Sequence, residues 1–249
     1  KIQTGYGLLS LTWRLDPIPN DAAFVSMKRV IDLALERNTK AFFNVGEFYG
    51  PNNANLILVK SFFQKYPELR HHVIISCKGG VDNVTFSPKG DYDSVVTSVE
   101  NSIEAMGGYI DIFEVARFDT TLLKDGDVYP KETFKALAAC VEEGKIGAIS
   151  LSEVNETEIR AVAADWGNYI SCVEVELSIF SPQILEDGVA KAGSDLGLII
   201  ICYSPLGRGL LTGTITPSTT FQEGDLRTHW RRFQGDALAK NQLCVDFLN

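Results

Sequence analysis

Two residues of the sequence could together carry out acid–base chemistry. Tyr49 lies in the segment 43–50, and Lys78 directly follows the apolar run 73–77. A cation beside a phenol stabilises the phenolate and lowers the pKa of the phenol from its ordinary value near ~10, so the phenol can exchange a proton near neutral pH. Taken singly, each residue is more often an ordinary loop aromatic or a solvated lysine. The pair is a candidate site only if the fold brings the two side chains together.

A second candidate follows a later apolar run. The stretch 202–210 contains Ser204, Arg208 and two glycines. Glycine-rich turns let backbone N–H groups approach a phosphate closely, and an arginine nearby would neutralise its charge. A merely structural turn explains the same residues, and the sequence leaves both readings open.

Seven short apolar runs with strand character recur along the chain, each about the length of a buried strand. Their hydrophobicity is nearly continuous rather than alternating, as in strands that are covered on both faces, and this favours a parallel sheet. The expected strands are 5–9, 41–44, 73–77, 109–115, 148–151, 172–175 and 198–203.

Segments with helical spacing separate these runs, and several carry start or stop signals. Asp21, Asp91 and Asn155 stand where a side chain could cap the first free N–H groups of a helix, and Gly107 stands where a helix could end. The expected helices are 22–37, 53–66, 92–106, 131–143, 156–165 and 182–196.

The alternation of strand and helix leaves two architectures, the closed barrel and the doubly wound open sheet. No G-x-G-x-x-G motif follows an expected strand, so the sequence favours a parallel (β/α)8 TIM barrel in one domain, residues 1–249. Active sites of such barrels lie at the C-terminal ends of the strands, where Tyr49 and Lys78 would meet. A closed barrel needs an eighth strand, so we expect the C-terminal part of the barrel to be absent from this chain.

The composition excludes several classes of protein. With 32 acidic against 23 basic residues the formal net charge is −9, and no basic cluster offers a footprint for nucleic acid. No apolar run approaches the length of a membrane span. The five cysteines and three histidines show no metal-ligand spacing, so we expect no metal site; scattered cysteines in apolar runs indicate a reducing, cytoplasmic location.

The order of several segments resembles the aldo-keto reductases over almost the whole chain. The family's F-D-T-A-x-x-Y-G is matched by 43–50, its T-K by Cys77-Lys78, its D-L-Y-x-x-H-R by 111–117, and its G-K-x-x-x-I-G-V-S-N by 144–153. The run Y-S-P-L-G-R-G-L-L-T-G at 203–213 is the most specific match.

The resemblance implies reduction of an aldehyde by NADPH, with Tyr49 as the general acid that protonates the carbonyl oxygen and Lys78 tuning its pKa. It also implies a set of residues around the cofactor. Ser152, Glu153 and Glu174 fall where the family contacts the nicotinamide carboxamide, Leu177 where an aromatic side chain usually stacks on the ring, and Ser204, Leu206 and Arg208 beside the pyrophosphate.

The chain also departs from the family pattern. Asn44 replaces a catalytic aspartate, Ala116 replaces a histidine, Glu153 and Glu174 replace an amide pair, and Leu177 lacks an aromatic face. These departures resemble the fungal pyridoxal reductase branch, which implies pyridoxal as the small-molecule substrate. Because an asparagine cannot cancel the charge of Lys78, we expect Tyr49 to experience a stronger cation, and to titrate at lower pH, than in relatives that carry an aspartate at this position.

Two alternatives to this function stay open. The missing aspartate and histidine are compatible with a cofactor-binding sensor or regulatory subunit that turns over little substrate. A reductase acting on other aldehydes is equally compatible with the residues present. The preference for NADPH over NADH depends on the resemblance alone.

Overall fold

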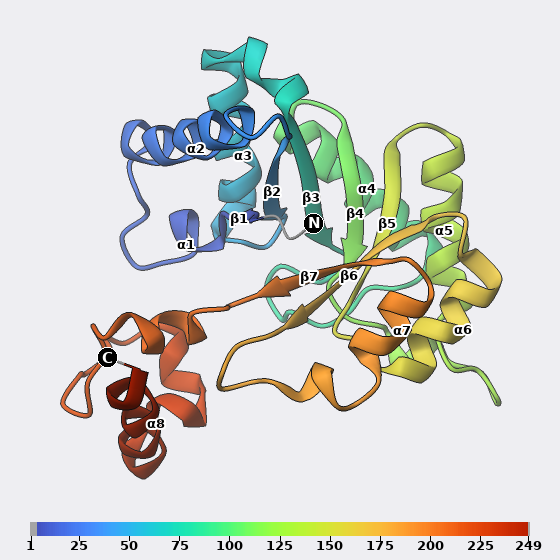
Figure 1. Cartoon of the computed structure of the whole chain (residues 1–249). Coiled ribbons are helices and arrows are strands. Elements are labelled where there is room, and N and C mark those ends of the chain that lie inside the picture. The colour runs from blue at the N-terminus through green and yellow to red at the C-terminus, as the bar shows by residue number, and fades with distance from the viewer. Residues whose placement is uncertain (1–3, 249) are drawn as a thin grey trace.

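The computed structural model describes residues 4–248, and its centre is one sheet of seven parallel strands (Figure 1). The strands pair in the order in which they occur in the chain, from β1 to β7, as in a (β/α) barrel. The sheet curls into a nearly closed barrel, and within residues 4–248 no pairing joins β7 to β1. The strands are β1 Tyr6–Gly7, β2 Ala41–Gly46, β3 Val73–Gly79, β4 Ile110–Val115, β5 Ile146–Ser152, β6 Ile170–Glu176 and β7 Ile199–Tyr203.

All seven expected strands are confirmed, although several are longer than the apolar runs. Polar or small residues extend them at the C-terminal ends, where Lys78, Ser152 and Glu176 still belong to their strands. The first strand is shorter than expected, because Leu9 already begins helix α1. The barrel class expected from the sequence is therefore correct.

Helices connect successive strands and cover the outer face of the sheet (Figure 1). The α-helices are α1 Leu9–Thr12, α2 Asn20–Leu35, α3 Ala54–Lys65, α4 Tyr92–Met106, α5 Lys131–Glu142, α6 Glu156–Trp166, α7 Val189–Asp195 and α8 Gly235–Leu248. The short 3-10 helices are η1 Pro51–Asn53, η2 Pro67–His72, η3 Thr120–Leu122, η4 Gln183–Leu185, η5 Gly207–Thr212, η6 Leu226–His229 and η7 Arg231–Phe233.

The expected single helix 182–196 is wrong, because the segment divides into η4 and α7. Gly188 lies between them with a φ of 91°, a left-handed conformation that an α-helix cannot continue through. A Cβ at this position would also meet the end of the Glu156 side chain, which would have to move aside.

Two of the three expected helix caps form. Asp91 accepts a hydrogen bond from the Ser94 N–H at the start of α4, and Asn155 forms a reciprocal capping box with Glu158 at the start of α6. Asp21 does not cap α2, because that helix begins at Asn20, two residues earlier than expected, and places Asp21 inside its first turn. There the carboxylate faces the positive end of the helix dipole instead.

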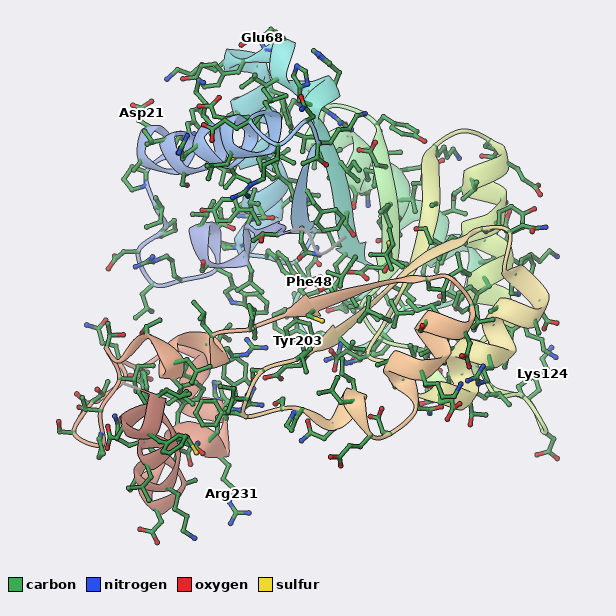
Figure 2. All side chains as sticks on the ribbon, viewed as in Figure 1. Asp21, Phe48, Glu68, Lys124, Tyr203 and Arg231 are labelled. Atoms are coloured by element: carbon green, nitrogen blue, oxygen red, sulfur yellow. The ribbon has the colours of Figure 1, made fainter. Side chains whose placement is uncertain are left out.

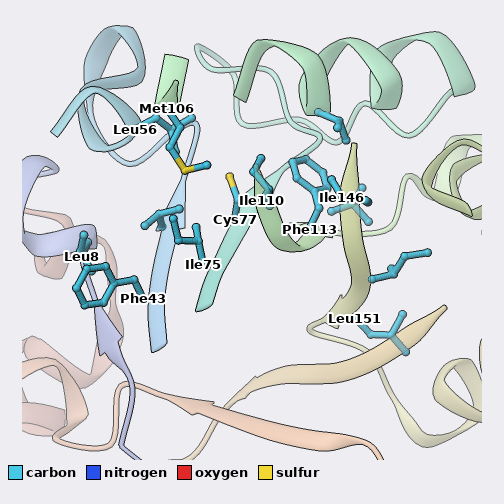
Figure 3. Packing of buried hydrophobic residues seen from close by; sticks show 14 of the residues in the cluster. Leu8, Phe43, Leu56, Ile75, Cys77, Met106, Ile110, Phe113, Ile146 and Leu151 are labelled. Atoms are coloured by element: carbon cyan, nitrogen blue, oxygen red, sulfur yellow. The ribbon is translucent and has the colours of Figure 1, made fainter. Parts of the chain in front are cut away.

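The main hydrophobic core lies between the strands and the surrounding helices (Figure 3). Phe43, Ile75 and Phe113 of the strands and Leu56 and Met106 of the helices are at most 4% exposed. This packing fixes the strands in register, and so it fixes the positions of the polar side chains at their C-terminal ends.

A second, smaller hydrophobic cluster follows β7 and consists of Leu210, Ile215, Phe233 and Leu238. The segment that contains it ends in α8 and forms a lobe beside the barrel (Figure 1). An ion pair of 2.6 Å between Arg232 and Glu176 ties the lobe to the end of β6.

Residues 4–248 contain neither a membrane-spanning helix nor a cluster of metal ligands. No helix in this part of the chain has both the length and the apolar composition that a bilayer crossing requires. Over the same residues, no three histidine, cysteine, aspartate or glutamate side chains are grouped as ligands for a metal ion.

Candidate active site

Side chains from four neighbouring strands meet at the C-terminal end of the barrel. Lys78 of β3 is the register partner of Glu114 of β4, and Ser152 of β5 is the register partner of Glu174 of β6. Tyr49 follows β2 in a tight turn, in which its N–H donates to the Gly46 carbonyl oxygen. The site therefore lies where parallel barrels carry their reactive groups.

Gly46 allows Tyr49 to fold back over the end of β2. A Cβ on Gly46 would lie 2.8 Å from Cδ1 of the Tyr49 ring, closer than a real side chain tolerates. The ring is 5% exposed in this position. A larger residue at Gly46 would push the phenol away from the strand ends.

Lys78 is the centre of a buried polar network. Its ammonium group donates to Oε1 of Glu174 at 2.8 Å and to Oγ of Ser152 at 3.1 Å, and it lies 3.4 Å from Oε1 of Glu114. Lys78 is 6% exposed, while Glu174 is 2% and Glu114 is 0% exposed. One cation thus faces two carboxylates in a region from which water is largely excluded.

Asn44 connects Tyr49 to this network. The Tyr49 hydroxyl donates to Oδ1 of Asn44 at 3.4 Å, and Nδ2 of Asn44 donates to Oε2 of Glu174 at 2.6 Å. The three residues expected to be catalytic, Tyr49, Lys78 and Asn44, are therefore joined through Glu174. From the sequence, Glu174 was expected only to contact the nicotinamide carboxamide of the cofactor.

The expectation that Lys78 lowers the pKa of Tyr49 from its ordinary value toward neutral pH is wrong. Burial raises the pKa of Tyr49 well above its ordinary value; Lys78 opposes this effect, but Glu174 and Glu114 add to it. Burial also works against a charged Lys78, yet the two carboxylates more than offset it and raise the pKa of the ammonium. The lysine charge is thus offset by buried carboxyl groups on other strands, chiefly Glu174 of β6 at 2.8 Å, rather than from position 44, and the phenol stays protonated.

Glu114 is a site residue that the sequence reasoning missed. Its signal in the sequence is an acidic residue inside an otherwise apolar strand. Burial raises the pKa of Glu114 to about 8, against the lowering effect of Lys78 and with a further increase from Glu174. A carboxyl group with such a pKa can change its charge near neutral pH.

The residues expected around a nicotinamide are only partly brought together. Ser152 and Glu174 belong to the buried network, whereas Glu153 turns outward with a φ of 55° and lies 3.7 Å from Arg117. Leu177 is half-buried against the main core, and its N–H donates to the Tyr203 carbonyl oxygen at 3.3 Å.

The loop after β7 has a backbone suited to an anion. Ser204 and Arg208 have φ values of 51° and 55°, and the glycines on either side of Arg208 are also left-handed. Loops that mix left-handed and right-handed residues form concave sites lined with N–H groups. Leu206 is 56% exposed in this loop, and the Arg208 guanidinium stacks 3.9 Å from the Trp230 ring. The loop thus combines a strongly curved backbone with an arginine, although the Gly207 and Gly209 N–H groups already donate to the Ser204 and Leu206 carbonyl oxygens.

Aromatic rings cover Tyr49 on its outer side, another feature that the sequence reasoning missed. Trp13 lies 6.3 Å from the Tyr49 ring and stacks on Phe86 at 5.4 Å, and Phe48 contacts Tyr49 edge-on at 5.1 Å. Figure 2 labels Phe48, and also Tyr203, whose ring lies 5.7 Å from the Lys78 ammonium. We call Trp13, Phe48 and Phe86 the aromatic roof.

Tyr49 after β2, Lys78 in β3 and the loop after β7 all lie at the C-terminal end of the barrel strands, where parallel barrels carry their active sites. The family model described as "Aldo/keto reductase family" matches residues 3–248. The chain belongs to the aldo/keto reductase family.

Individual relatives agree with this assignment. The chain is 60% identical over 248 residues to the "Putative pyridoxal reductase" of Saccharomyces cerevisiae, covering 100% of this chain and 72% of the relative. It is 38% identical over 215 residues to the "Probable pyridoxal reductase 2" of Schizosaccharomyces pombe, covering 85% of this chain and 61% of that protein. Against that second relative, the chain spans less than two thirds of the length.

A solved structure supports the fold. The glycerol dehydrogenase of Gluconobacter oxydans superposes with a TM-score of 0.73 at 19% identity, covering 97% of this chain and 71% of that chain. At this identity the likeness concerns the barrel architecture alone.

The contact between Asn44 and Glu174 explains two departures from the family pattern together. The pattern has an aspartate at position 44 and an amide at position 174, and this chain has the amide at 44 and the carboxylate at 174. The two groups share one hydrogen bond of 2.6 Å. The carboxylate and the amide are thus exchanged across the bond, and a negative charge is retained beside Lys78.

Proposed function

We propose that this protein reduces an aldehyde to an alcohol with NADPH, and that pyridoxal, reduced to pyridoxine in vitamin B6 metabolism, is its substrate. The observation that carries the proposal is the connected buried network of Tyr49, Asn44, Glu174, Lys78 and Ser152 at the C-terminal end of the barrel. A proton donor, a fixed cation and hydrogen-bonding groups for a ring amide are thereby held at one place.

Tyr49 acts in this proposal as the donor of a proton to the carbonyl oxygen. Its raised pKa keeps the phenol protonated near neutral pH, as a general acid requires. Lys78 stabilises the phenolate that remains after the transfer. Asn44 accepts the hydrogen bond of the resting hydroxyl and so fixes its direction.

The proposed NADPH position uses the two other groups of residues. NADPH supplies the hydride when it is bound, and the family generally uses NADP(H). Ser152 accepts from Lys78 and keeps its own hydroxyl hydrogen to donate to a carboxamide oxygen, while Glu174 would accept from the amide nitrogen. The remaining cofactor-binding residues in this proposal are Glu153, Leu177, Ser204, Leu206 and Arg208.

The aromatic roof and the names of the relatives support pyridoxal as the substrate. Trp13 lies 6.3 Å from Tyr49 and stacks on Phe86, and aromatic rings of this kind favour a planar heteroaromatic ring by offset stacking. Two relatives carry pyridoxal reductase in their names. We further propose a cytoplasmic location, because Cys202 and Cys244 are exposed free thiols, which persist in a reducing compartment.

A single-turnover experiment on the intact protein tests the function. The protein saturated with NADPH is mixed with pyridoxal, and loss of the dihydronicotinamide absorbance is followed in a stopped-flow instrument. We expect one equivalent of NADPH to be oxidised, and to be oxidised faster than with a short aliphatic aldehyde. NADPH that binds but is not oxidised by any aldehyde would instead establish a cofactor sensor, and equal rates with all aldehydes would remove pyridoxal as the specific substrate.

A further inference from the structure

The buried network contains two carboxyl groups, Glu174 and Glu114, around the single cation of Lys78. Glu174 receives donors from both sides, the Lys78 ammonium at 2.8 Å and the Asn44 amide at 2.6 Å. Glu114 has only the longer contact of 3.4 Å with Lys78, and neither of its oxygens accepts a hydrogen bond from the part of the chain that the structure describes. Of the two carboxyl groups, Glu114 is the one less able to hold a negative charge.

The charge balance of the site follows from this difference. With both carboxyl groups ionised, the buried network of Lys78, Glu114 and Glu174 would carry one uncompensated negative charge, which is costly away from water. With a proton on Glu114 the network is neutral. The raised pKa of Glu114, to about 8, agrees with this proton distribution.

Glu114 is the group at this place that can change charge near neutral pH. Burial raises the pKa of the Cys77 thiol and raises that of the Cys172 thiol to about 11, so both stay neutral. The raised pKa values of Tyr49 and Lys78 keep their protons bound as well. The titratable groups that face Glu114 are Lys78 and Cys77 of β3, Tyr49 after β2, and Glu174 and Cys172 of β6.

We propose that Glu114 releases its proton to solvent when an oxidised, cationic nicotinamide occupies the site, and keeps the proton when the ring is reduced and neutral. The inference rests on the proposed function, because that proposal places the nicotinamide against Glu174 and Ser152. A cation beside the network favours the ionised form of Glu114, and by linkage the ionised form favours the cation. The net charge of the buried site then stays unchanged when the ring becomes cationic.

Calorimetry on the unmodified intact protein measures this proton directly. Binding of NADP⁺ and of NADPH is titrated at about pH 7 in two buffers of different ionisation enthalpy, and the difference in heat counts the protons released. We expect NADP⁺ to release close to one proton more than NADPH. The 2′-phosphate is common to both nucleotides, so its own protonation cancels in the comparison. At about pH 9.5 the difference should disappear, because Glu114 is then already ionised.

Two matched variants assign the proton to its residue. Glu114→Gln keeps the shape of the side chain, and it should abolish the extra proton and weaken NADP⁺ relative to NADPH by at least about tenfold at high pH. Glu47→Gln is the control: Glu47 is 6% exposed, and its carboxylate accepts from Ser98 of α4 and forms no ion pair with Lys78 in the described part of the chain, although its backbone N–H donates to the Lys78 carbonyl oxygen. This control should retain the extra proton and the affinity ratio.

The outcomes separate this inference from the proposed function. Equal proton release with the two nucleotides in the unmodified protein, or an extra proton that survives Glu114→Gln, would overturn the inference alone. If neither nucleotide binds, the proposed function fails and the inference fails with it.

Discussion

Exchanging the side chains at positions 44 and 174 tests the charge arrangement that distinguishes this site. Asn44→Asp alone would place a second carboxylate against Glu174, across a bond that is now 2.6 Å long. The double variant Asn44→Asp/Glu174→Gln restores one carboxylate and one amide, in the order of the family pattern. The single change should therefore be damaging, and the second change should reverse the damage.

The size of the effect follows from the distance. Two carboxylates whose charge centres are about 4 Å apart repel by roughly 4 kcal/mol at an effective dielectric near 20, which corresponds to about three pKa units. Rather than keep both charges, the pair will bind a proton, so its pKa in the folded state lies above the unfolded value. Such a group contributes stability that is complete below the unfolded pKa and is lost as the pH rises through the folded pKa. The loss in Asn44→Asp should thus be small near about pH 4.5 and several kcal/mol near about pH 8.

Urea unfolding of the four proteins in this double-mutant cycle, at both pH values, provides the measurement. We expect a coupling free energy of at least about 2 kcal/mol near pH 8, which shrinks at the lower pH. Losses that simply add in the double variant, or an Asn44→Asp protein as stable as the unmodified one near pH 8, would show that the two side chains do not share the proposed bond.

Three further changes test other parts of the structure. Lys78→Met leaves Glu114 and Glu174 without their cation and should lower the free energy of unfolding by about 3–5 kcal/mol near pH 8. The loss should be smaller near pH 5, where Glu114 is protonated. Denaturant titration at both pH values checks this, and a pH-independent loss would contradict it. Trp13→Ala removes one ring of the aromatic roof and should raise the KM for pyridoxal several-fold, while the KM for a short aliphatic aldehyde stays nearly unchanged. Steady-state kinetics with both substrates tests this. Equal changes in the two KM values would argue against ring stacking. Asn155→Ala removes the capping box of α6 and should lower the free energy of unfolding, measured in urea, by about 1 kcal/mol while kcat stays unchanged. An unchanged unfolding midpoint would mean that solvent caps the helix equally well.

The barrel could be predicted from the sequence because its signals are local. Each strand is a short apolar run, and α4 and α6 begin at the expected caps Asp91 and Asn155. The helix 182–196 was mispredicted because its helical spacing runs across Gly188, whereas the left-handed φ of 91° at Gly188 divides the segment into η4 and α7.

The location of the site could be predicted because parallel barrels carry their active sites at the C-terminal ends of the strands. Tyr49 and Lys78 follow adjacent strands, so the rule for parallel barrels brings them to one end. The sign of the Tyr49 pKa shift was not predictable, because it depends on Glu114 and Glu174, which reach Lys78 from β4 and β6. The hydrogen bond between Asn44 and Glu174 joins residues 130 positions apart, so no local sequence pattern could predict it.

The most direct test of the central claim is the single-turnover rate of Tyr49→Phe in the intact protein. The substitution removes a hydroxyl whose hydrogen bond to Asn44 is 3.4 Å long, and it keeps a ring that is 5% exposed, so folding and NADPH affinity should change little. Since general acid catalysis is typically worth ~10²–10⁴-fold, we expect NADPH oxidation by pyridoxal to slow by that order while the Kd of NADPH stays within about twofold. A Tyr49→Phe protein that binds NADPH normally and oxidises it at nearly the unmodified rate would contradict the assignment of Tyr49 as the proton donor.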